Sequence, residues 1–444
     1  MLKKILCGFL AVAMAATAFA GCSSNGNGSS SAAGSSEAGS TPAASSEAGS
    51  GEETNLRLAL WDYDVTGYDK VMVEAFQEKN PNIKVEVTST PNADYANKIS
   101  VMLAGNDNVD VYYIKSNTDY PTFVLKNFVM NLDELITKNN FDLTPYGTVL
   151  DQHYKMDGSL YALPYRTNDW VLFYNKKIFD DAGVDYPSNN MTWEETRELA
   201  KKVTSGEGGD KIYGMYFTPK VSFILPAMVG KIPNYDNMTS DFSDLAYSMN
   251  WFIGMQNDDQ TYESFANAKS MSQDQTYFFK GKSAMYYNGS WFVQLLKINS
   301  DKVDFEWGVA KSPYWEGTEK AGFATSTPIA INSKTEKVDA SWKLLEFLTG
   351  AEGAKILADN MMVPGYMSDE VMEAYKTSTG IDDSSYEALT NNTTYGFGAP
   401  NELNGLVTAA LQEELELAIT GNQSVDDTVK RMEERRTEII EQNK

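Results

Sequence analysis

The order of periodic segments between Asn55 and Asn117 constrains the fold more than any other feature of the chain. Three of these segments are interpreted as strands, the first of them because it alternates apolar and polar residues, and the other two as helices. In chain order they are 55–64 (strand), 69–81 (helix), 82–90 (strand), 94–105 (helix) and 109–117 (strand). A βαβαβ order predicts a parallel sheet with right-handed crossovers, and ligands bind outside the carboxyl ends of such strands. We therefore expect Trp61–Asp64 and Lys115–Asn117 at one rim of the sheet.

The pattern restarts after Tyr165, and 444 residues are enough for two or three domains. The helix signals include a capping box, Thr192 with Glu195, and an N-cap at Ser424 ahead of a charged amphipathic helix. A tight turn is predicted at Asn288–Gly289, after the strand-like run "SAMYY". These segments predict a second α/β domain.

Charge and composition exclude several classes of function. The formal net charge of -24 argues against a nucleic-acid partner, because so acidic a surface repels phosphate backbones. His153 is the single histidine and there are only two cysteines, which argues against a metal site with nitrogen and sulfur ligands. His153 lies in a polar stretch and is interpreted as a solvated loop residue. The residues indicate no cofactor and no metal.

The N-terminus has the layout of a secretory signal peptide, with two lysines, a short apolar run and small residues. The segment Phe19-Ala20-Gly21-Cys22 resembles the lipobox of bacterial lipoproteins, in which leucine usually takes the place of Phe19. The resemblance implies cleavage before Cys22 and a lipid anchor on its thiol; secretion with an unmodified Cys22 is the alternative. The stretch from Cys22 to residue 53 is rich in Ser, Gly, Ala and Glu, which predicts a disordered tether.

Several segments together resemble the extracellular solute-binding proteins of ABC importers, in particular the carbohydrate-binding group that is similar to maltose-binding protein. They are "DYANKISVMLAGNDNVDV", "GSLYALPY", "VLFYNKKIFDDAGV", "MTWEETRELAKKV", "FFKGKSAMYYNGSW" and "AINSKTEKVDASWKLLEFLTGAEGAK". The match runs with gaps from about Asn55 to the C-terminus. It implies a two-lobed α/β fold of type II, in which each lobe is a mostly parallel sheet flanked by helices and is discontinuous in sequence.

The resemblance also implies a domain division and a function. The expected segments are a signal peptide (1–21), the lipidated Cys22 with its tether (22–53), lobe 1 (54–165 with 326–366) and lobe 2 (166–325 with 367–444). Sugar would bind between the lobes and pass to the transmembrane subunits of the importer. The protein would be a monomer, anchored at the outer face of the bacterial cell membrane, and it would perform no chemistry.

The stretch from Ser159 to Phe179 combines aromatic rings with the polar run "RTND" at the expected crossing between lobes. A sugar presents a flat apolar C–H face and an edge of hydroxyls, so its site needs rings beside hydrogen-bonding groups. Five residues of the stretch offer this mixture: Tyr165, Arg166, Asn168, Asp169 and Trp170. Asn168 takes the place of a glutamate that contacts sugar in maltose-binding protein, which keeps an acceptor and loses a charge. Val171–Tyr174 are interpreted as core.

The remaining candidates come from the resemblance. Trp291 in "YYNGSW" falls on a family motif whose tryptophan stacks on sugar, and its alternative is a core tryptophan at a helix start. The alternative role of Asp64 is to cap the next helix, and the alternative role of Asn117 is that of a turn residue. The full set of further expected ligand contacts is Trp61, Asp64, Asn117, Trp291, Trp315, Thr325 and Tyr366.

The sequence leaves two alternative functions open. A surface glycosidase would need two carboxylates at a fixed separation, and no motif singles out such a pair among the 61 acidic residues. An importer-linked binder of another solute is the second alternative: rings and acids also form cages for cations, which the net charge would attract, and a peptide is a further option.

Overall fold

The computed structural model describes residues 53–115, 119–147, 149–150, 154–398 and 400–444, all of them in the unit Gly51–Lys444. The predicted signal peptide, Cys22, Asn117, His153 and all but the last residue of the predicted tether lie outside these residues. The described residues form two hydrophobic cores, which we call the first and the second lobe core. The first is built mainly from residues 56–165 and 329–362, and the second mainly from residues 170–323 and 354–432.

The first lobe has the predicted βαβαβ order. Its elements are β1 (Thr54–Trp61), α1 (Tyr63–Thr66), α2 (Tyr68–Lys79), β2 (Ile83–Thr90), α3 (Asn92–Ala104), β3 (Val111–Tyr113), α4 (Tyr120–Leu125), α5 (Asp133–Asn139), β4 (Lys155–Met156) and β5 (Ser159–Leu160). Strand β1 pairs in parallel with β2 and with β3, which confirms the predicted parallel sheet. Helix α3 begins at Asn92, two residues before the predicted start.

The second lobe begins on the far half of β6 (Leu163–Asn175). Its further elements are α7 (Lys176–Ala182), α8 (Trp193–Val203), β7 (Tyr213–Tyr216), α9 (Val221–Val229), α10 (Leu245–Asn257), α11 (Phe265–Ser270), α12 (Thr276–Phe279), β8 (Ser283–Gly289), α13 (Phe292–Ile298) and β9 (Trp307–Lys311). The capping box of Thr192 and Glu195 is present, with both reciprocal hydrogen bonds. The predicted turn at Asn288–Gly289 is wrong: both residues belong to β8 and pair with β6.

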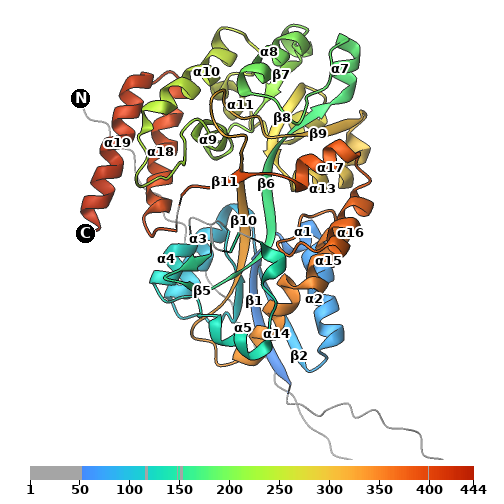
Figure 1. Ribbon diagram of the computed structural model, residues 1–444, viewed down its shortest axis with the longest axis vertical. Coiled ribbons are helices and arrows are strands. Elements are labelled where there is room, and N and C mark those ends of the chain that lie inside the picture. The colour runs from blue at the N-terminus through green and yellow to red at the C-terminus, as the bar shows by residue number, and fades with distance from the viewer. Residues whose placement is uncertain (1–52, 116–118, 148, 151–153, 399) are drawn as a thin grey trace, which may run out of the picture. The chain divides into compact units, whose positions relative to one another are not determined.

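Two long strands, β6 and β10 (Gly322–Ile331), run from one lobe core to the other (Figure 1). Strand β6 contributes Tyr165 to the first core and Trp170 to the second, and β10 contributes Phe323 to the second core and Ile329 to the first. The two strands pair with each other in antiparallel fashion. They join all the main strands into one sheet with the order β2-β1-β3-β10-β6-β8-β7. Every antiparallel pair in that sheet involves β6 or β10.

The C-terminal part is mostly helical, as the sequence predicts. It comprises α14 (Val338–Thr349), α15 (Ala351–Asp359), α16 (Asp369–Thr379), α17 (Asp383–Thr390), β11 (Thr394–Tyr395), α18 (Asn404–Ile419) and α19 (Val425–Gln442). Ser424 caps α19 as predicted, its hydroxyl accepting the backbone N–H of Asp427. Helix α15 faces both cores, since Leu357 packs in the first and Ala358 in the second. Among the described helices, none is long and apolar enough to cross a membrane.

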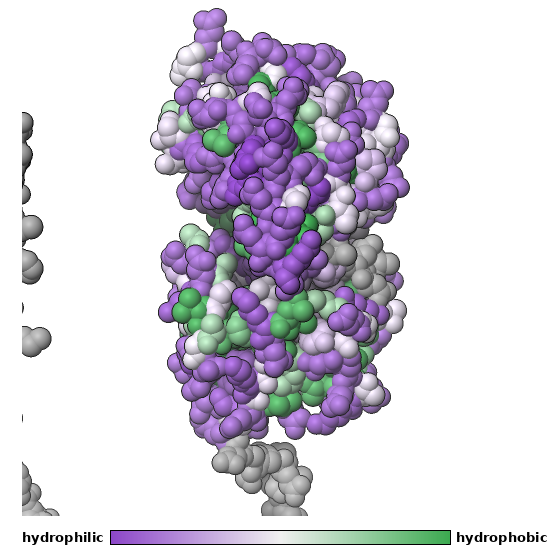
Figure 2. Space-filling view, turned by 90° about the vertical axis from the view of Figure 1, so that its left-hand side faces the viewer, coloured by the Kyte–Doolittle hydropathy of each residue, from purple (hydrophilic) through white to green (hydrophobic). Residues whose placement is uncertain are grey.

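This arrangement confirms the predicted fold class, a two-lobed α/β protein. Figure 2 shows that the surface is mostly hydrophilic and is hollowed between the two halves that hold the cores. Strands β6 and β10 pass through that level, so residues at their midpoints lie where the lobes meet.

Candidate functional site

The alternation of β6 places Arg166, Asn168 and Trp170 on one face of the sheet. On the neighbouring strand β10, Thr327 pairs with Arg166 and Thr325 pairs with Asn168, so these threonines share that face. Three residues predicted from the sequence as ligand contacts on β6 are therefore neighbours along one line. We call this line, with the tryptophan that adjoins each of its ends, the hinge row: Trp61, Arg166, Thr327, Asn168, Thr325, Trp170 and Trp291.

Trp61 adjoins the first-lobe end of the hinge row. It is the last residue of β1 and is 8% exposed. Its ring packs against the rings of Tyr95 and Tyr113, with centroids 5.1 and 5.8 Å away. The guanidinium carbon of Arg166 lies 5.6 Å from the centre of the Trp61 ring, within range of a cation–π interaction.

Arg166 is held by two hydrogen bonds and keeps donors to spare. Its Nε donates to the Thr327 hydroxyl at 3.3 Å, and its Nη1 donates to the Tyr68 hydroxyl. Within the described part of the chain, its Nη2 makes no hydrogen bond to protein. Because a guanidinium carries five N–H donors in a rigid plane, Arg166 can offer the unused ones to an acceptor between the lobes.

A buried carboxyl group supports Arg166 from behind. Asp69 is 3% exposed and accepts hydrogen bonds from the hydroxyls of Tyr113, at 2.9 Å, and Tyr165, at 2.8 Å. Burial raises the pKa of Asp69, and the nearby positive charge of Arg166 acts against that rise. Tyr165, 1% exposed with its hydroxyl donating to Asp69, belongs to this buried group, and its predicted role as a ligand contact stays a prediction.

Trp291 adjoins the second-lobe end of the row. It is the N-cap residue of α13, is half-buried and packs against both lobe cores. Its ring meets the ring of Trp170 edge-on, at 89° and 5.5 Å. Trp170 is also enclosed by Phe223 and Tyr287, at 5.2 and 5.4 Å. Trp170 thus forms a wall behind Trp291, and the two rings close the row on this side.

The middle of the row is polar and incompletely paired. Among the described residues, the Asn168 side-chain oxygen and the Trp170 indole N–H are buried without a hydrogen-bond partner. One is an acceptor and the other a donor. Leaving such a group unpaired costs about 1–3 kcal/mol, so both favour a state in which a polar guest reaches them.

The structure places the other predicted residues differently. Trp315 is 1% exposed, packs in the second lobe core and donates its indole N–H to the Ala227 carbonyl at 2.7 Å; its predicted ligand contact stays a prediction. Tyr366 packs against Tyr146 and lines a pocket of about 580 Å³ beside α14, whose lining contains no residue of the hinge row. Asp64 is exposed in the short helix α1. It does not cap α2, because Gly67 is the N-cap residue of that helix.

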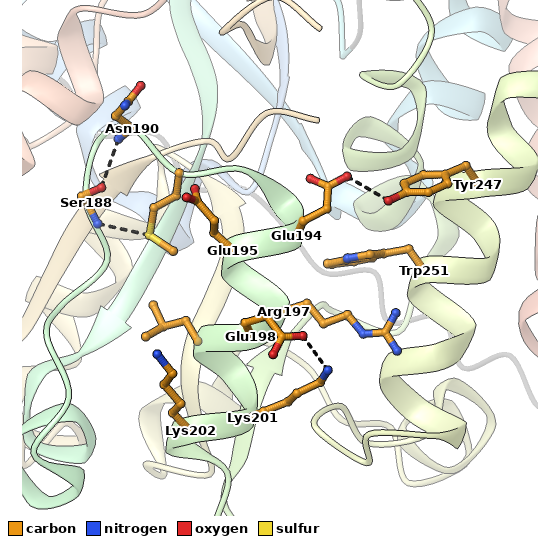
Figure 3. Close-up of a pocket in the computed structure, with 12 residues that line it drawn as sticks. Ser188, Asn190, Glu194, Glu195, Arg197, Glu198, Lys201, Lys202, Tyr247 and Trp251 are labelled. Carbon is orange, nitrogen blue, oxygen red and sulfur yellow. Dashed lines mark hydrogen bonds and ion pairs between the residues drawn. The ribbon is translucent and has the colours of Figure 1, made fainter. Parts of the chain in front are cut away.

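A larger pocket, of about 780 Å³, lies between α8 and α10 on the second lobe (Figure 3). Glu194 and Tyr247 face each other across it and share a hydrogen bond of 3.1 Å, and Glu198 pairs with Lys201 at 2.6 Å. Among the described residues, the charged groups of its lining other than Lys202 have hydrogen-bond or ion-pair partners, and the pocket contains no residue of the hinge row. One buried donor of the lining, the Trp251 indole N–H, lacks a partner, whereas the hinge row has both a donor and an acceptor without one. We therefore place the candidate site at the row.

Comparison with known proteins assigns the family. Residues 64–355 match the family model of the bacterial extracellular solute-binding proteins. The chain belongs to this family.

Relatives of this solute-binding protein include sugar binders and a binder of a phosphorylated polyol. The multiple sugar-binding protein of Streptococcus mutans is 25% identical over 64% of this chain and 68% of its own length. The sn-glycerol-3-phosphate-binding periplasmic protein UgpB of Agrobacterium fabrum is 26% identical over 48% of this chain, which spans about half of that relative (49%).

Solved structures agree with the fold. A sugar transporter from Rhizobium etli, in an open conformation, is 31% identical, has a TM-score of 0.75 and covers 86% of this chain and 99% of its own. The maltose-bound MalE3 of T. maritima, 19% identical over 87% of this chain and 99% of its own, has a TM-score of 0.72. The second likeness concerns the fold alone.

Sequence reasoning missed the support formed by Tyr68 and Asp69. Both lie in the first turn of α2, where an acidic residue is usually interpreted as a favourable partner of the helix dipole. The sequence signal that could have identified this pair is an aspartate next to an aromatic residue, Tyr68-Asp69, shortly after the end of β1. Only the tertiary structure brings Asp69 against Tyr165 of β6, which lies 96 positions later in the sequence.

Asp169 lies on the opposite face of β6 from the hinge row. Its carboxylate accepts a hydrogen bond from the Asn392 side chain at 2.9 Å, and its carbonyl accepts the Ser290 N–H at 2.8 Å. Burial raises the pKa of Asp169 from 3.8 to about 6. In the structure Asp169 links β6 to the segment before β11, and its predicted role as a ligand contact stays a prediction.

The raised pKa of Asp169 makes a prediction for stability. Because the folded state binds this proton more tightly than the unfolded state, ionising Asp169 lowers the free energy of unfolding as pH rises from about 4 to about 6. Asp169→Asn keeps an acceptor for Asn392 and removes the charge. We expect it to stabilise the protein by roughly 1–3 kcal/mol at pH 8 and by nothing at pH 4, measured by urea unfolding. An equal gain in the free energy of unfolding of Asp169→Asn over wild type at both pH values would contradict a raised pKa of Asp169.

Proposed function

We propose that this solute-binding protein captures a carbohydrate, an oligosaccharide by our expectation, between its lobes and delivers it to an ABC importer. The observation that carries the proposal is the composition of the hinge row. Two tryptophan rings, Trp61 and Trp291, lie at its ends, and neutral hydrogen-bonding groups of Asn168 and Thr325 lie between them. A sugar needs both kinds of surface.

The charges of the row favour a neutral guest. Arg166 is its single charged member, and the charge of nearby Asp69 acts on it; Oδ1 of Asp69 accepts hydrogen bonds from the hydroxyls of Tyr113 and Tyr165. A phosphate or carboxylate would meet one arginine and no second cation in the row, whereas anion sites favour paired cationic donors. The S. mutans relative and the R. etli neighbour, both described as proteins of sugar uptake or binding, support the same class of ligand.

The proposed mechanism is a hinged clamp. Lobe 1 comprises residues 54–165 and 326–366 and lobe 2 residues 166–325 and 367–444, joined by β6 and β10. A guest that contacts both lobes only when they close shifts the population toward the closed form. The closed monomer then meets the permease subunits, while a lipid on Cys22 keeps it at the outer face of the cell membrane. The chain itself performs no reaction and uses no cofactor.

A ligand panel tests this function. We expect maltose, maltotriose or a related oligosaccharide to raise the melting temperature, because a ligand at about 100 times its Kd adds about 2.7 kcal/mol to the free energy of unfolding. D-mannitol, sn-glycerol 3-phosphate, choline and spermidine serve as comparison ligands. Binding that weakens steeply with added salt would identify a charged ligand and contradict the proposal, since a neutral sugar is insensitive to screening.

Replacing one ring of the row tests the site. We expect Trp291→Ala to weaken binding of the panel's best carbohydrate by about 1–3 kcal/mol, measured by calorimetry, because the substitution removes a stacking surface. The matched control is Trp307→Ala, which removes a half-buried tryptophan of the same lobe, on β9, outside the row. Equal affinities of wild type and Trp291→Ala would remove Trp291 from the site.

A further inference from the structure

Gly289 and the indole of Trp291 occupy the same small volume. Gly289 is the last residue of β8 and pairs with Trp170 on β6. A Cβ atom at position 289 would lie 1.8 Å from Cζ3, 2.1 Å from Cη2 and 2.2 Å from Cε3 of Trp291. Non-bonded carbon atoms meet at about 3.5–4.0 Å, so no other amino acid fits beneath this ring.

The requirement for glycine here is one of space and not of backbone conformation. Gly289 has no positive φ, and its backbone is that of an ordinary strand residue. An alanine would therefore suit the strand itself. What it would displace is the ring of Trp291, whose movement toward Trp170 is blocked because the enclosed ring of Trp170 meets it edge-on.

We propose that Gly289 is a positioning residue for ligand binding: its bare Cα forms the floor on which Trp291 lies flat, so that the opposite face of the indole is presented to the carbohydrate. The inference rests on the proposed function and extends it. It assigns a specificity role to a residue that touches no ligand. A side chain at position 289 would swing the indole away from Trp170 and toward solvent, and the stacking surface at this end of the hinge row would be lost.

Two other glycines provide matched controls. Gly308 on β9 also lies beneath a ring, since a Cβ there would be 2.3 Å from Cζ of Tyr174, whose ring packs against Phe179 and Tyr186. Gly208–Asp210 is a short surface turn, in which a Cβ on Gly209 would meet no atom within 4 Å. Gly308→Ala thus creates a similar steric clash in the same lobe but outside the hinge row. Gly209→Ala makes the same substitution without a clash.

The first experiment needs no ligand. Acrylamide quenching of tryptophan fluorescence is compared between wild type and Trp291→Phe, and between Gly289→Ala and Gly289→Ala/Trp291→Phe, so that each difference isolates the emission of Trp291. We expect the quenching constant of Trp291 to rise about twofold or more in Gly289→Ala, and to stay unchanged in Gly308→Ala and Gly209→Ala. An unchanged constant in folded Gly289→Ala would overturn the inference.

The second experiment is a double-mutant cycle on the Kd for maltotriose. We expect Gly289→Ala to weaken binding about tenfold, and Gly289→Ala/Trp291→Ala to bind no more weakly than Trp291→Ala alone, because the glycine acts only through the ring. Gly308→Ala should lower the melting temperature without changing the Kd. The positioning role would be contradicted if the losses of maltotriose binding free energy in Gly289→Ala and Trp291→Ala added up in the double variant. It would also be contradicted if Gly289→Ala bound maltotriose with wild-type affinity. If wild type does not bind maltotriose, the proposed function fails for that sugar, and the quenching result alone decides the role of Gly289.

Discussion

The antiparallel pairing of β6 with β10 is the constraint on which the rest of the structure depends. Each strand is buried in one lobe core at one end and in the other core at its other end, so neither lobe is complete without both. The pairing fixes a register in which Arg166 faces Thr327 and Asn168 faces Thr325. A slip of one residue would turn these polar groups to the opposite face and bring Thr167 and Asp169 in their place. The hinge and the candidate site are thus set by one ladder of hydrogen bonds.

A consequence of this arrangement is a concentration of unpaired polar atoms at the hinge. Within the described residues, Thr167, Asn168, Trp170, Asn288 and Ser290 each have a buried side-chain donor or acceptor with no partner, and all belong to adjoining parts of β6 and β8 or to the residue just after β8. A stable core rarely tolerates such a group. Asn168 and Trp170 belong to the hinge row, where the guest proposed above would supply their partners. The raised pKa of the Asp169 carboxyl, on the other face, has the same origin in burial.

Much of the fold follows from the sequence because local patterns and global topology agree. The strand patterns in 55–61 and 83–90, the capping box at Thr192 and the cap at Ser424 each depend on a few neighbouring residues, and the structure has all of these elements. The site was only partly predictable. The mixture of rings and polar groups in the stretch 159–179 identified Arg166, Asn168 and Trp170 together with Tyr165 and Asp169, but whether a ring faces a ligand or a core depends on distant segments. Trp315 shows this: its neighbours Trp193 and Trp251 come from α8 and α10, which no local pattern brings together. Asp69 was missed for the same reason, since its partner Tyr165 is far away in sequence.

A crystal structure of the protein with the carbohydrate that most raises its melting temperature tests the central claim most directly. The account predicts a sugar ring stacked on Trp291 or Trp61, with hydroxyls in hydrogen-bonding reach of the free guanidinium nitrogen of Arg166 and the side-chain oxygen of Asn168. A ligand held instead in the pocket between α8 and α10, with the hinge row making no contact to it, would contradict the account.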